Sequence, residues 1–247
     1  LSLTLRRDGS SKFGSNNRYG NFPSFSAGWN VAEEEFVKNN IPWLEQLKLR
    51  GGYGVLGNQE INNYQYVSVV NTGINYPDGN GGLIQGAFPK EFANPDIKWE
   101  ETAMTNVGID VMALRNRLTL TADWYVKNTK DILLNVPIPI SSGGANDPIQ
   151  NAGKIRNQGF EFNLGWNESL NKDLSYGVSF LGTYNKNEVI ALGEGMQPIE
   201  RGTIHGGTYT TRTLAGYPIG GFWLIPTDGY FNSAEEVVLH QIVMKFH

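Results

Sequence analysis

The sequence predicts an all-β protein: a partial antiparallel, up-and-down transmembrane β-barrel of about seven long strands with long polar loops. Three observations support this prediction. The 247 residues include 30 glycines and 12% aromatic residues but only 18% charged residues, so turn formers and strand formers are plentiful. Apolar and polar residues alternate over long segments. The later connections between these segments alternate between long and short.

Alternation with a period of two identifies the strands, because successive side chains of a strand point to opposite faces. The segments on either side of the turn 114–117 show it most clearly, since apolar residues take every second position in both. The same pattern predicts seven strands, at 1–5, 24–31, 47–55, 99–111, 118–126, 160–166 and 174–184. Several of these runs exceed the length of about 5–6 residues that is usual in soluble proteins, and suit the roughly 9–11 residues of a membrane-spanning strand.

The lengths of the connections distinguish two ends of the predicted sheet. Residues 57–98 and 127–154 form long connections, whereas 114–117 and 167–173 form short turns. The first two connections do not show this contrast. Outer-membrane barrels have short turns at the periplasmic rim and longer loops outside, so the later connections fit that architecture.

Two regions are expected along the chain. Residues 1–185 should contain the barrel-wall strands with their connecting loops, and residues 186–247 should form a long extracellular loop region with a truncated or atypical end. The first residues, LSLTL, have the pattern of the interior of a strand, which indicates a fragment or a processed chain.

The apolar side of the predicted strands carries four tryptophans. Trp29, Trp99, Trp124 and Trp166 share this side, and Glu, Asp, Asn, Thr and Lys occupy the opposite one. We expect these indoles to face the membrane as part of an aromatic girdle, with the polar side lining a wet lumen. The residues alone leave an alternative open, in which the same apolar side forms the core of a soluble carbohydrate-binding or adhesive β-sandwich.

Composition and motifs argue against other functional classes. A net charge of −4 without a block of basic residues argues against nucleic-acid binding, and the absence of cysteine removes thiol chemistry. Gly52, Gly54 and Gly57 match G-x-G-x-x-G, but no amphipathic helix follows them, so we expect no bound nucleotide. We expect no enzymatic activity; changing Glu100 and Glu161 to Gln would test the alternative of a glycan hydrolase.

The three histidines do not form a predicted metal site. His205, His240 and His247 each lack a second ligand at a metal-binding spacing. We therefore expect neither a bound metal nor a cofactor.

Six segments, taken together, cover most of the chain in the order in which they occur in a known family. They are LRRDGSSKFGSNNRYGNFPSFSAGW (5–29), LKLRGGYGVLGNQ (47–59), NPDIKWEETAMTNVGID (94–110), NRLTLTADWYVKNTKDILLNVPIP (116–139), NAGKIRNQGFEFNLGW (151–166) and PIGGFWLIPTDGYF (218–231). In these segments the chain resembles the C-terminal β-barrel of the SusC/RagA-type TonB-dependent outer-membrane transporters of Bacteroidetes.

The resemblance implies uptake of a nutrient, an oligosaccharide or a peptide, through a barrel of about 22 strands in the outer membrane of a Gram-negative cell. It also implies two protein partners: a SusD-like surface lipoprotein, and TonB, which acts through a plug that this chain lacks. If the resemblance holds, the long connections contact substrate or lipoprotein, and Tyr64, Tyr66 and Trp223 are the aromatic candidates for those contacts. The segment 238–247 departs from the family pattern.

Overall fold

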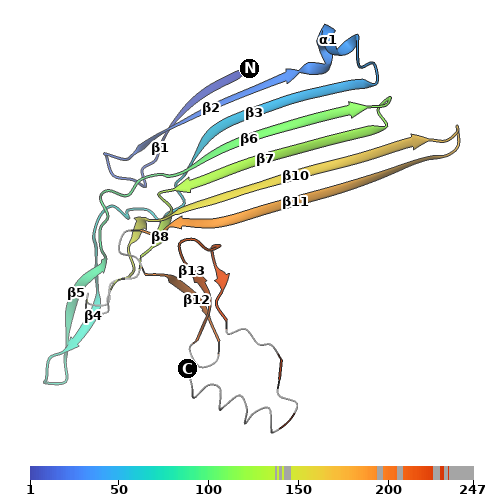
Figure 1. The fold of residues 1–247 in the computed structure, drawn as a ribbon. Helices are drawn as coiled ribbons and strands as arrows, with labels where there is room; N and C mark the ends of the chain where they lie inside the picture. Colours follow the sequence, from blue (N-terminus) through green and yellow to red (C-terminus); the bar gives the residue numbers. More distant parts are fainter. Residues whose placement is uncertain are drawn as a thin grey trace.

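Seven antiparallel strands form one curved, open sheet (Figure 1). The computed structural model describes residues 1–136, 138, 141, 146–193, 197–204, 208–224, 229–230 and 233. The strands lie side by side in chain order, apart from inserted shorter strands: β1 (Ser2–Gly9), β2 (Tyr19–Asn30), β3 (Leu44–Asn58), β6 (Glu100–Ala113), β7 (Leu118–Lys130), β10 (Lys154–Ser169) and β11 (Ser175–Ala191). The predicted seven-stranded up-and-down arrangement is confirmed, and β1 and β11 are its two edges.

The long strands exceed the predicted lengths. β3, β10 and β11 have 15, 16 and 17 residues, more than the roughly 9–11 that a tilted strand needs to cross a bilayer. β11 also continues to Ala191, beyond the boundary at 185 that the sequence predicts. These strands therefore extend past the apolar part of the sequence and carry polar residues at their ends.

Shorter elements occupy the connections. The β2–β3 connection contains η1 (Val31–Glu33) and α1 (Glu35–Lys38). Three small sheets lie in the long connections and after β11: β4 (Val69–Pro77) with β5 (Leu83–Glu91), β8 (Leu133–Asn135) with β9 (Ile149–Asn151), and β12 (Ile199–Thr203) with β13 (Tyr209–Thr213) and β14 (Gly221–Phe222). Among the described residues, no helix has the length and the apolar composition to span a membrane.

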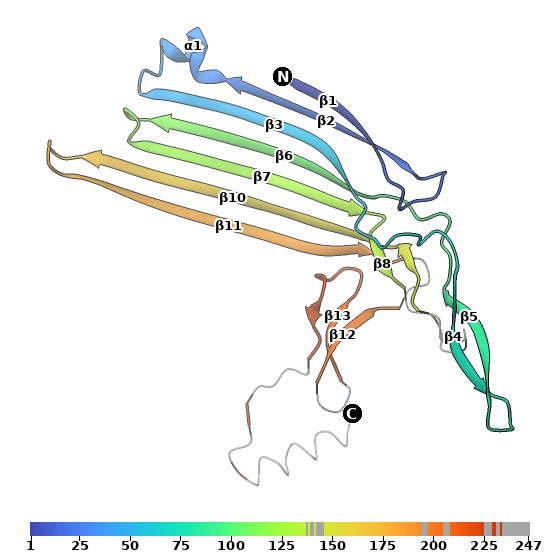
Figure 2. The same cartoon turned by 180° about the vertical axis from the view of Figure 1, so that it is seen from behind.

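Short and long connections lie at opposite ends of the sheet. Figures 1 and 2 show the β6–β7 and β10–β11 turns at the same end as α1, and the β4–β5, β8–β9 and β12–β13 elements at the other. The predicted contrast is therefore confirmed for the later connections. The first two connections do not show it, because the β2–β3 connection (31–43), at the end with the short turns, is longer than the β1–β2 connection (10–18), at the opposite end. We call these ends the turn end and the loop end.

The register places the predicted apolar residues on one face. Trp29 pairs with Leu49, and the same row continues across the sheet through Ile109, Ala122 and Phe162. The next row, shifted by one residue, has the opposite character and runs through Gly28, Arg50, Gly108, Asp123, Glu161 and Thr183. Because neighbouring residues of a row share a face, the sheet has one apolar and one polar face.

The apolar face is not the core of a sandwich. Trp29, Phe180 and Tyr184 are 51%, 62% and 68% exposed, although they lie on three long strands of this face. The other sheets of the described chain have only two or three strands each and lie at the loop end. No second layer shields these rings within the described residues, so the described part of the chain does not form the soluble sandwich that the sequence left open as an alternative.

A compact hydrophobic cluster lies at the loop end instead. Phe13 and Ile97 are fully buried there beside Phe22, Ile61 and Trp99. The Trp99 ring lies 5.2 Å from the Phe13 ring and 5.4 Å from the Phe22 ring, centre to centre, in tilted and edge-on arrangements. Such aromatic pairs add about 0.5–1.5 kcal/mol beyond the burial of their surface. This cluster holds the loops on the end of the sheet.

Candidate functional site

Two groups of aromatic residues mark the apolar face. Trp124, Phe160 and Tyr184 pair in one row across β7, β10 and β11, and form the loop-side belt. Trp29, Trp166 and Tyr176 lie near the turn ends of their strands, and form the turn-side belt. Phe160 and Trp166 are six residues apart on β10, which corresponds to about 20 Å along the strand. At a strand tilt of about 40° this spacing corresponds to roughly 15 Å of height, which is less than the apolar band of about 25 Å in outer-membrane barrels.

The four predicted membrane-facing tryptophans differ in their surroundings. Trp29 and Trp124 are about half exposed on the apolar face, and Trp166 is partly exposed there. The Nε1 of Trp29 donates a hydrogen bond to Oε1 of Glu34 at 2.8 Å, which keeps its polar edge at the turn end. Trp99 departs from the prediction, because it is only 7% exposed and lies inside the loop-end cluster, where its Nε1 donates to the carbonyl of Arg18. It precedes β6, so loop residues cover it.

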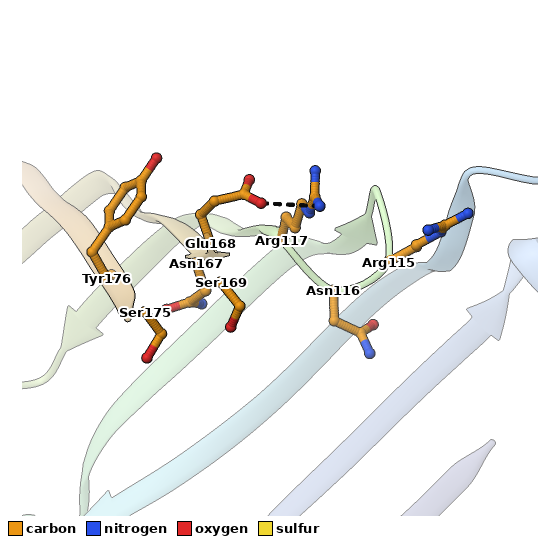
Figure 3. A pocket seen from close by; sticks show the side chains of 9 residues that line it. Arg115, Asn116, Arg117, Asn167, Glu168, Ser169, Ser175 and Tyr176 are labelled. Carbon is orange, nitrogen blue, oxygen red and sulfur yellow. Dashed lines mark ion pairs between the residues drawn. The ribbon is translucent and has the colours of Figure 1, made fainter. Parts of the chain in front are cut away.

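Charged residues bound the apolar face at the turn end. Arg117 and Glu168 form an ion pair of 2.9 Å beside Tyr176, at a hollow of about 500 Å³ (Figure 3). Figure 3 shows these three side chains extending to one side, while Ser169 and Ser175 extend to the other. The change from apolar to charged residues is therefore sharp at this end.

An ion-pair network joins three strands on the polar face. Arg50 on β3 donates to both carboxylate oxygens of Asp123 on β7, at 2.6 and 2.7 Å, and to Asp110 on β6, at 3.1 and 3.3 Å. Asn106 donates to Oδ1 of Asp123 at 3.1 Å. Hydrogen bonds between ionised groups are shorter and stronger than neutral ones, and the paired geometry to Asp123 fixes the direction of the guanidinium.

Gly108 explains how Arg50 reaches across an intervening strand. Arg50 pairs with Gly108, and Gly108 pairs with Asp123 on the next strand. A Cβ at position 108 would lie 2.6 Å from both Cζ of Arg50 and Oδ1 of Asp123, which is closer than atoms can approach. The missing side chain therefore leaves the space in which the ion pair forms.

The same arrangement recurs on β10. Tyr125 pairs with Gly159, and Gly159 pairs with Asn185. The hydroxyl of Tyr125 passes over the glycine and forms a hydrogen bond of 3.2 Å with Oδ1 of Asn185. Polar side chains therefore connect alternate strands on this face, as is typical of the polar interior of an outer-membrane barrel.

The three predicted contact aromatics also differ from one another. Tyr64 is 63% exposed, in the connection between β3 and β4, with a positive φ of 65°. Trp223 is half exposed, and the guanidinium of Arg212 lies 4.4 Å from its ring centre. Tyr66 instead packs against the loop-end cluster, so its ring supports its own loop. Within the described chain, the loop end therefore presents Tyr64 and one face of Trp223 to solvent.

The segment 94–99 is joined to the β8–β9 ribbon by side-chain hydrogen bonds, a contact that the sequence did not reveal. The amide of Asn94 donates to the carbonyl of Ile149 at 3.0 Å. Asn151 accepts from the backbone N–H of Lys98 at 2.8 Å and donates to its carbonyl at 2.7 Å, and it also donates to the carbonyl of Asp131 at 2.9 Å. One side chain thus pairs with a backbone as a neighbouring strand would. Only the tertiary structure brings these residues together.

A cavity of about 350 Å³ lies where the β8–β9 ribbon meets β12–β14. Apolar side chains dominate its lining, and Arg201 and Asn135 are among its polar members.

No group of three potential metal ligands occurs among the described residues. His205, His240, His247 and the predicted atypical segment 238–247 lie outside those residues.

Comparison with known proteins decides the family. The sequence profile of the family described as "TonB dependent receptor-like, beta-barrel" matches residues 1–237. The chain belongs to this family. TonB-dependent receptor P39 of Formosa agariphila is 37% identical over 220 residues, which cover 87% of this chain and 20% of that receptor. TonB-dependent receptor SusC of Bacteroides thetaiotaomicron is 37% identical over 196 residues, which cover 78% of this chain and 19% of SusC.

Solved structures of the RagAB peptide transporter are similar to the TonB-dependent receptor barrel segment described above. One superposes with a TM-score of 0.74 at 32% identity, covering 89% of this chain and 23% of that one. The structure of the RagAB peptide importer in the "closed-closed" state gives a TM-score of 0.73. The chain thus spans about a fifth of the length of its relatives. The predicted SusC/RagA resemblance and barrel fold are confirmed, and an outer-membrane location follows from the family.

Proposed function

We propose that this chain forms part of the barrel wall of an outer-membrane importer for nutrients such as oligosaccharides or peptides. The observation that carries the proposal is the two-faced sheet, which exposes aromatic rings on one face and a connected polar network on the other. In this proposal the apolar face contacts lipid, and the polar face lines the passage. The loop end faces the extracellular side, as the long loops of outer-membrane barrels do.

The segment works as part of a complete barrel. The unpaired backbone groups of an open sheet are not tolerated in hydrocarbon, and β1 and β11 each have only one neighbour here. Strands contributed by the rest of the parent protein would pair with these edges. TonB would supply energy through a plug that also belongs to the rest of the parent.

A SusD-like surface lipoprotein is the proposed partner at the loop end, and Tyr64 and Trp223 are the proposed contacts for substrate or for this partner. Both rings are exposed at that end, and an aromatic face can stack on a sugar ring or on an apolar side chain. Two of the similar proteins support a role in transport. One is the TonB-dependent receptor SusC, and the other is the RagAB peptide importer. We propose that the protein is a transporter and catalyses no reaction.

Uptake by the full-length parent tests this function. Asn163 and Leu164 are consecutive residues of β10 on the polar and the apolar face, respectively. In a cysteine-free parent, Asn163→Cys and Leu164→Cys would each be treated with a bulky hydrophilic maleimide before uptake of labelled oligosaccharide or peptide is measured. We expect the reagent to reduce uptake by the Asn163→Cys protein and to leave the Leu164→Cys protein unchanged. Equal inhibition of both, or of neither, would contradict the proposed passage.

A further inference from the structure

The cavity of about 350 Å³ beside the β8–β9 ribbon lies against the polar face of the sheet, and we call it the loop-end cavity. Ile155 on β10 and Val189 on β11 line it, and they are direct neighbours across the two strands. Each lies six residues from a member of the polar row, Glu161 or Thr183, so alternation puts both on the polar face. The cavity is therefore on the face that we assign to the passage.

Backbone hydrogen bonds fix the strands around this cavity. Val189 accepts from the N–H of Gly216 at 2.8 Å and donates to the carbonyl of Tyr217 at 2.9 Å, which fastens the β12–β14 region to the edge of β11. Across the cavity, the carbonyl of Ile132 accepts from the N–H of Ala152 at 2.7 Å. The cavity is therefore formed before a ligand binds, so binding does not have to order its walls.

The lining of the loop-end cavity suits an apolar group. Val189 is only 1% exposed, and further aliphatic surface comes from Leu133, Leu134, Ala191, Leu192, Ile199 and Ile219. A sugar would leave hydroxyl groups without hydrogen-bond partners against these walls, whereas an apolar side chain would displace water that is poorly held. Engineered apolar cavities of about 150 Å³ already bind a benzene-sized molecule, so this cavity has room for a large side chain.

Arg201 adds a positive charge to this apolar lining. It lies on β12 two residues from Ile199, so both are on the same face of the small sheet. The other face carries Arg212, whose guanidinium is already paired with Glu200 at 2.6 Å. Within the described part of the chain, no carboxylate forms an ion pair with Arg201. Its guanidinium can therefore bind the carboxylate of a ligand with the forked geometry that this group prefers.

We propose that the loop-end cavity binds the C-terminal residue of a short peptide, with an apolar side chain inside the cavity and the terminal carboxylate on Arg201. Asn135 is an exposed member of the lining, and its amide can both donate to and accept from a peptide bond. A fatty acid shares the apolar body and the carboxylate but offers no peptide bond to Asn135. The inference rests on the proposed function and narrows its substrates to peptides.

Binding of defined ligands to the purified full-length parent tests the proposal. Isothermal titration calorimetry in detergent would compare the peptide Gly-Gly-Leu with its C-terminal amide, with Gly-Gly-Ser, with octanoate and with maltotriose. Arg201→Gln removes the charge, and Ala191→Leu reduces the cavity. The controls are Lys172→Gln, in the turn between β10 and β11, and Ala215→Leu, at an exposed residue outside the lining. Retention of the folded band in an unheated gel would verify that each variant folds.

We expect Gly-Gly-Leu to bind the unchanged protein most tightly. Its amide should bind roughly 10- to 100-fold more weakly, the usual effect of losing a hydrogen bond between charged groups, and Gly-Gly-Ser should lose a similar factor. Arg201→Gln should bind the acid and the amide alike, Ala191→Leu should weaken binding of Gly-Gly-Leu, and the controls should change neither. Equal binding of acid and amide to the unchanged protein, or binding of octanoate or maltotriose as tight as that of Gly-Gly-Leu, would overturn the proposal.

A failure of this proposal can be separated from a failure of the proposed function. If the maleimide experiment on Asn163 and Leu164 assigns the faces as expected while Gly-Gly-Leu binds no better than its amide, the passage is supported and only the peptide site is wrong. If Gly-Gly-Leu binds as expected but Leu164→Cys is the inhibited variant, the peptide site is supported and the assignment of faces is wrong.

Discussion

The middle of the seven-stranded sheet and its loop end are stabilised in different ways. In the middle, apolar rings such as Phe180 remain 62% exposed, and the polar face is held by ion pairs across strands. At the loop end, Phe13 and Ile97 are fully buried in a cluster that resembles the core of a soluble protein. The comparison shows that the wall lacks an internal core and depends on its surroundings, whereas the loop end carries its own.

The largest effect is expected at the loop end. Phe13→Ala removes a fully buried ring beside Trp99 and should destabilise the loop end by about 3–5 kcal/mol, the usual cost of such a cavity. Hydrogen exchange of the full-length parent would show faster exchange in the loops, with the middle of the strands unchanged. Phe36→Ala is the control, since Phe36 is 60% exposed on α1. If both variants exchange alike, the cluster does not hold the loops.

A charge on the apolar face should have the next largest effect. Leu120→Arg places a cation near the middle of the apolar band and should cost about 2–4 kcal/mol in a bilayer. Thr121→Arg, one residue further on the polar face, should cost less than about 1 kcal/mol, because it enters water. Urea unfolding of the parent in lipid vesicles would measure both. A larger cost at Thr121 would reverse our assignment of the two faces.

Adding a single methyl group tests the ion-pair network of Arg50 and Asp123 on the polar face. Gly108→Ala puts a Cβ where Arg50 and Asp123 meet, and should lower stability by about 1–3 kcal/mol. Gly51→Ala on the neighbouring strand is a matched control, since a Cβ there meets only the carbonyl of Asn106, at 3.8 Å. Unfolding curves of the two variants should differ. Identical curves would mean that the ion pair shifts without loss.

The smallest expected effect concerns the link between loops. Asn151→Ala removes the side-chain hydrogen bonds to Lys98 and Asp131, and should weaken the attachment of the β8–β9 ribbon by about 1–3 kcal/mol. The adjacent Gln150→Ala serves as the control. Limited proteolysis of the loop end should be faster for the Asn151 variant alone. Unchanged proteolysis would show that packing, rather than this amide, positions the ribbon.

Strand positions and faces could be predicted from the sequence because alternation is a local property. The apolar side chains of Leu120, Trp124 and Phe160 occupy the face that their spacing predicts. Trp99 follows the same spacing but immediately precedes β6, where loop residues bury it. No local sequence pattern indicates that contact. Prediction from alternation therefore fails where a strand ends and tertiary packing begins.

The connections were harder to predict for a related reason. β4 and β5 are largely exposed on both faces. Neither strand therefore needs an apolar face, and an alternating pattern cannot identify them. The ion pair between Arg50 and Asp123 depends on the exact pairing of three strands, which the sequence alone does not specify. Gly108 offered the only local signal, and a glycine in a strand has several explanations.

A nitroxide scan along β11 of the full-length parent in lipid vesicles tests the central claim most directly. Spin labels placed one at a time from Ser175 to Ala191 would report collisions with oxygen, which concentrates in lipid, and with a water-soluble nickel chelate. We predict opposite two-residue oscillations, with oxygen contact highest at Val178, Phe180 and Gly182, fading beyond Tyr184. Uniform access of the nickel chelate along the whole strand would contradict the claim that this sheet is a membrane wall.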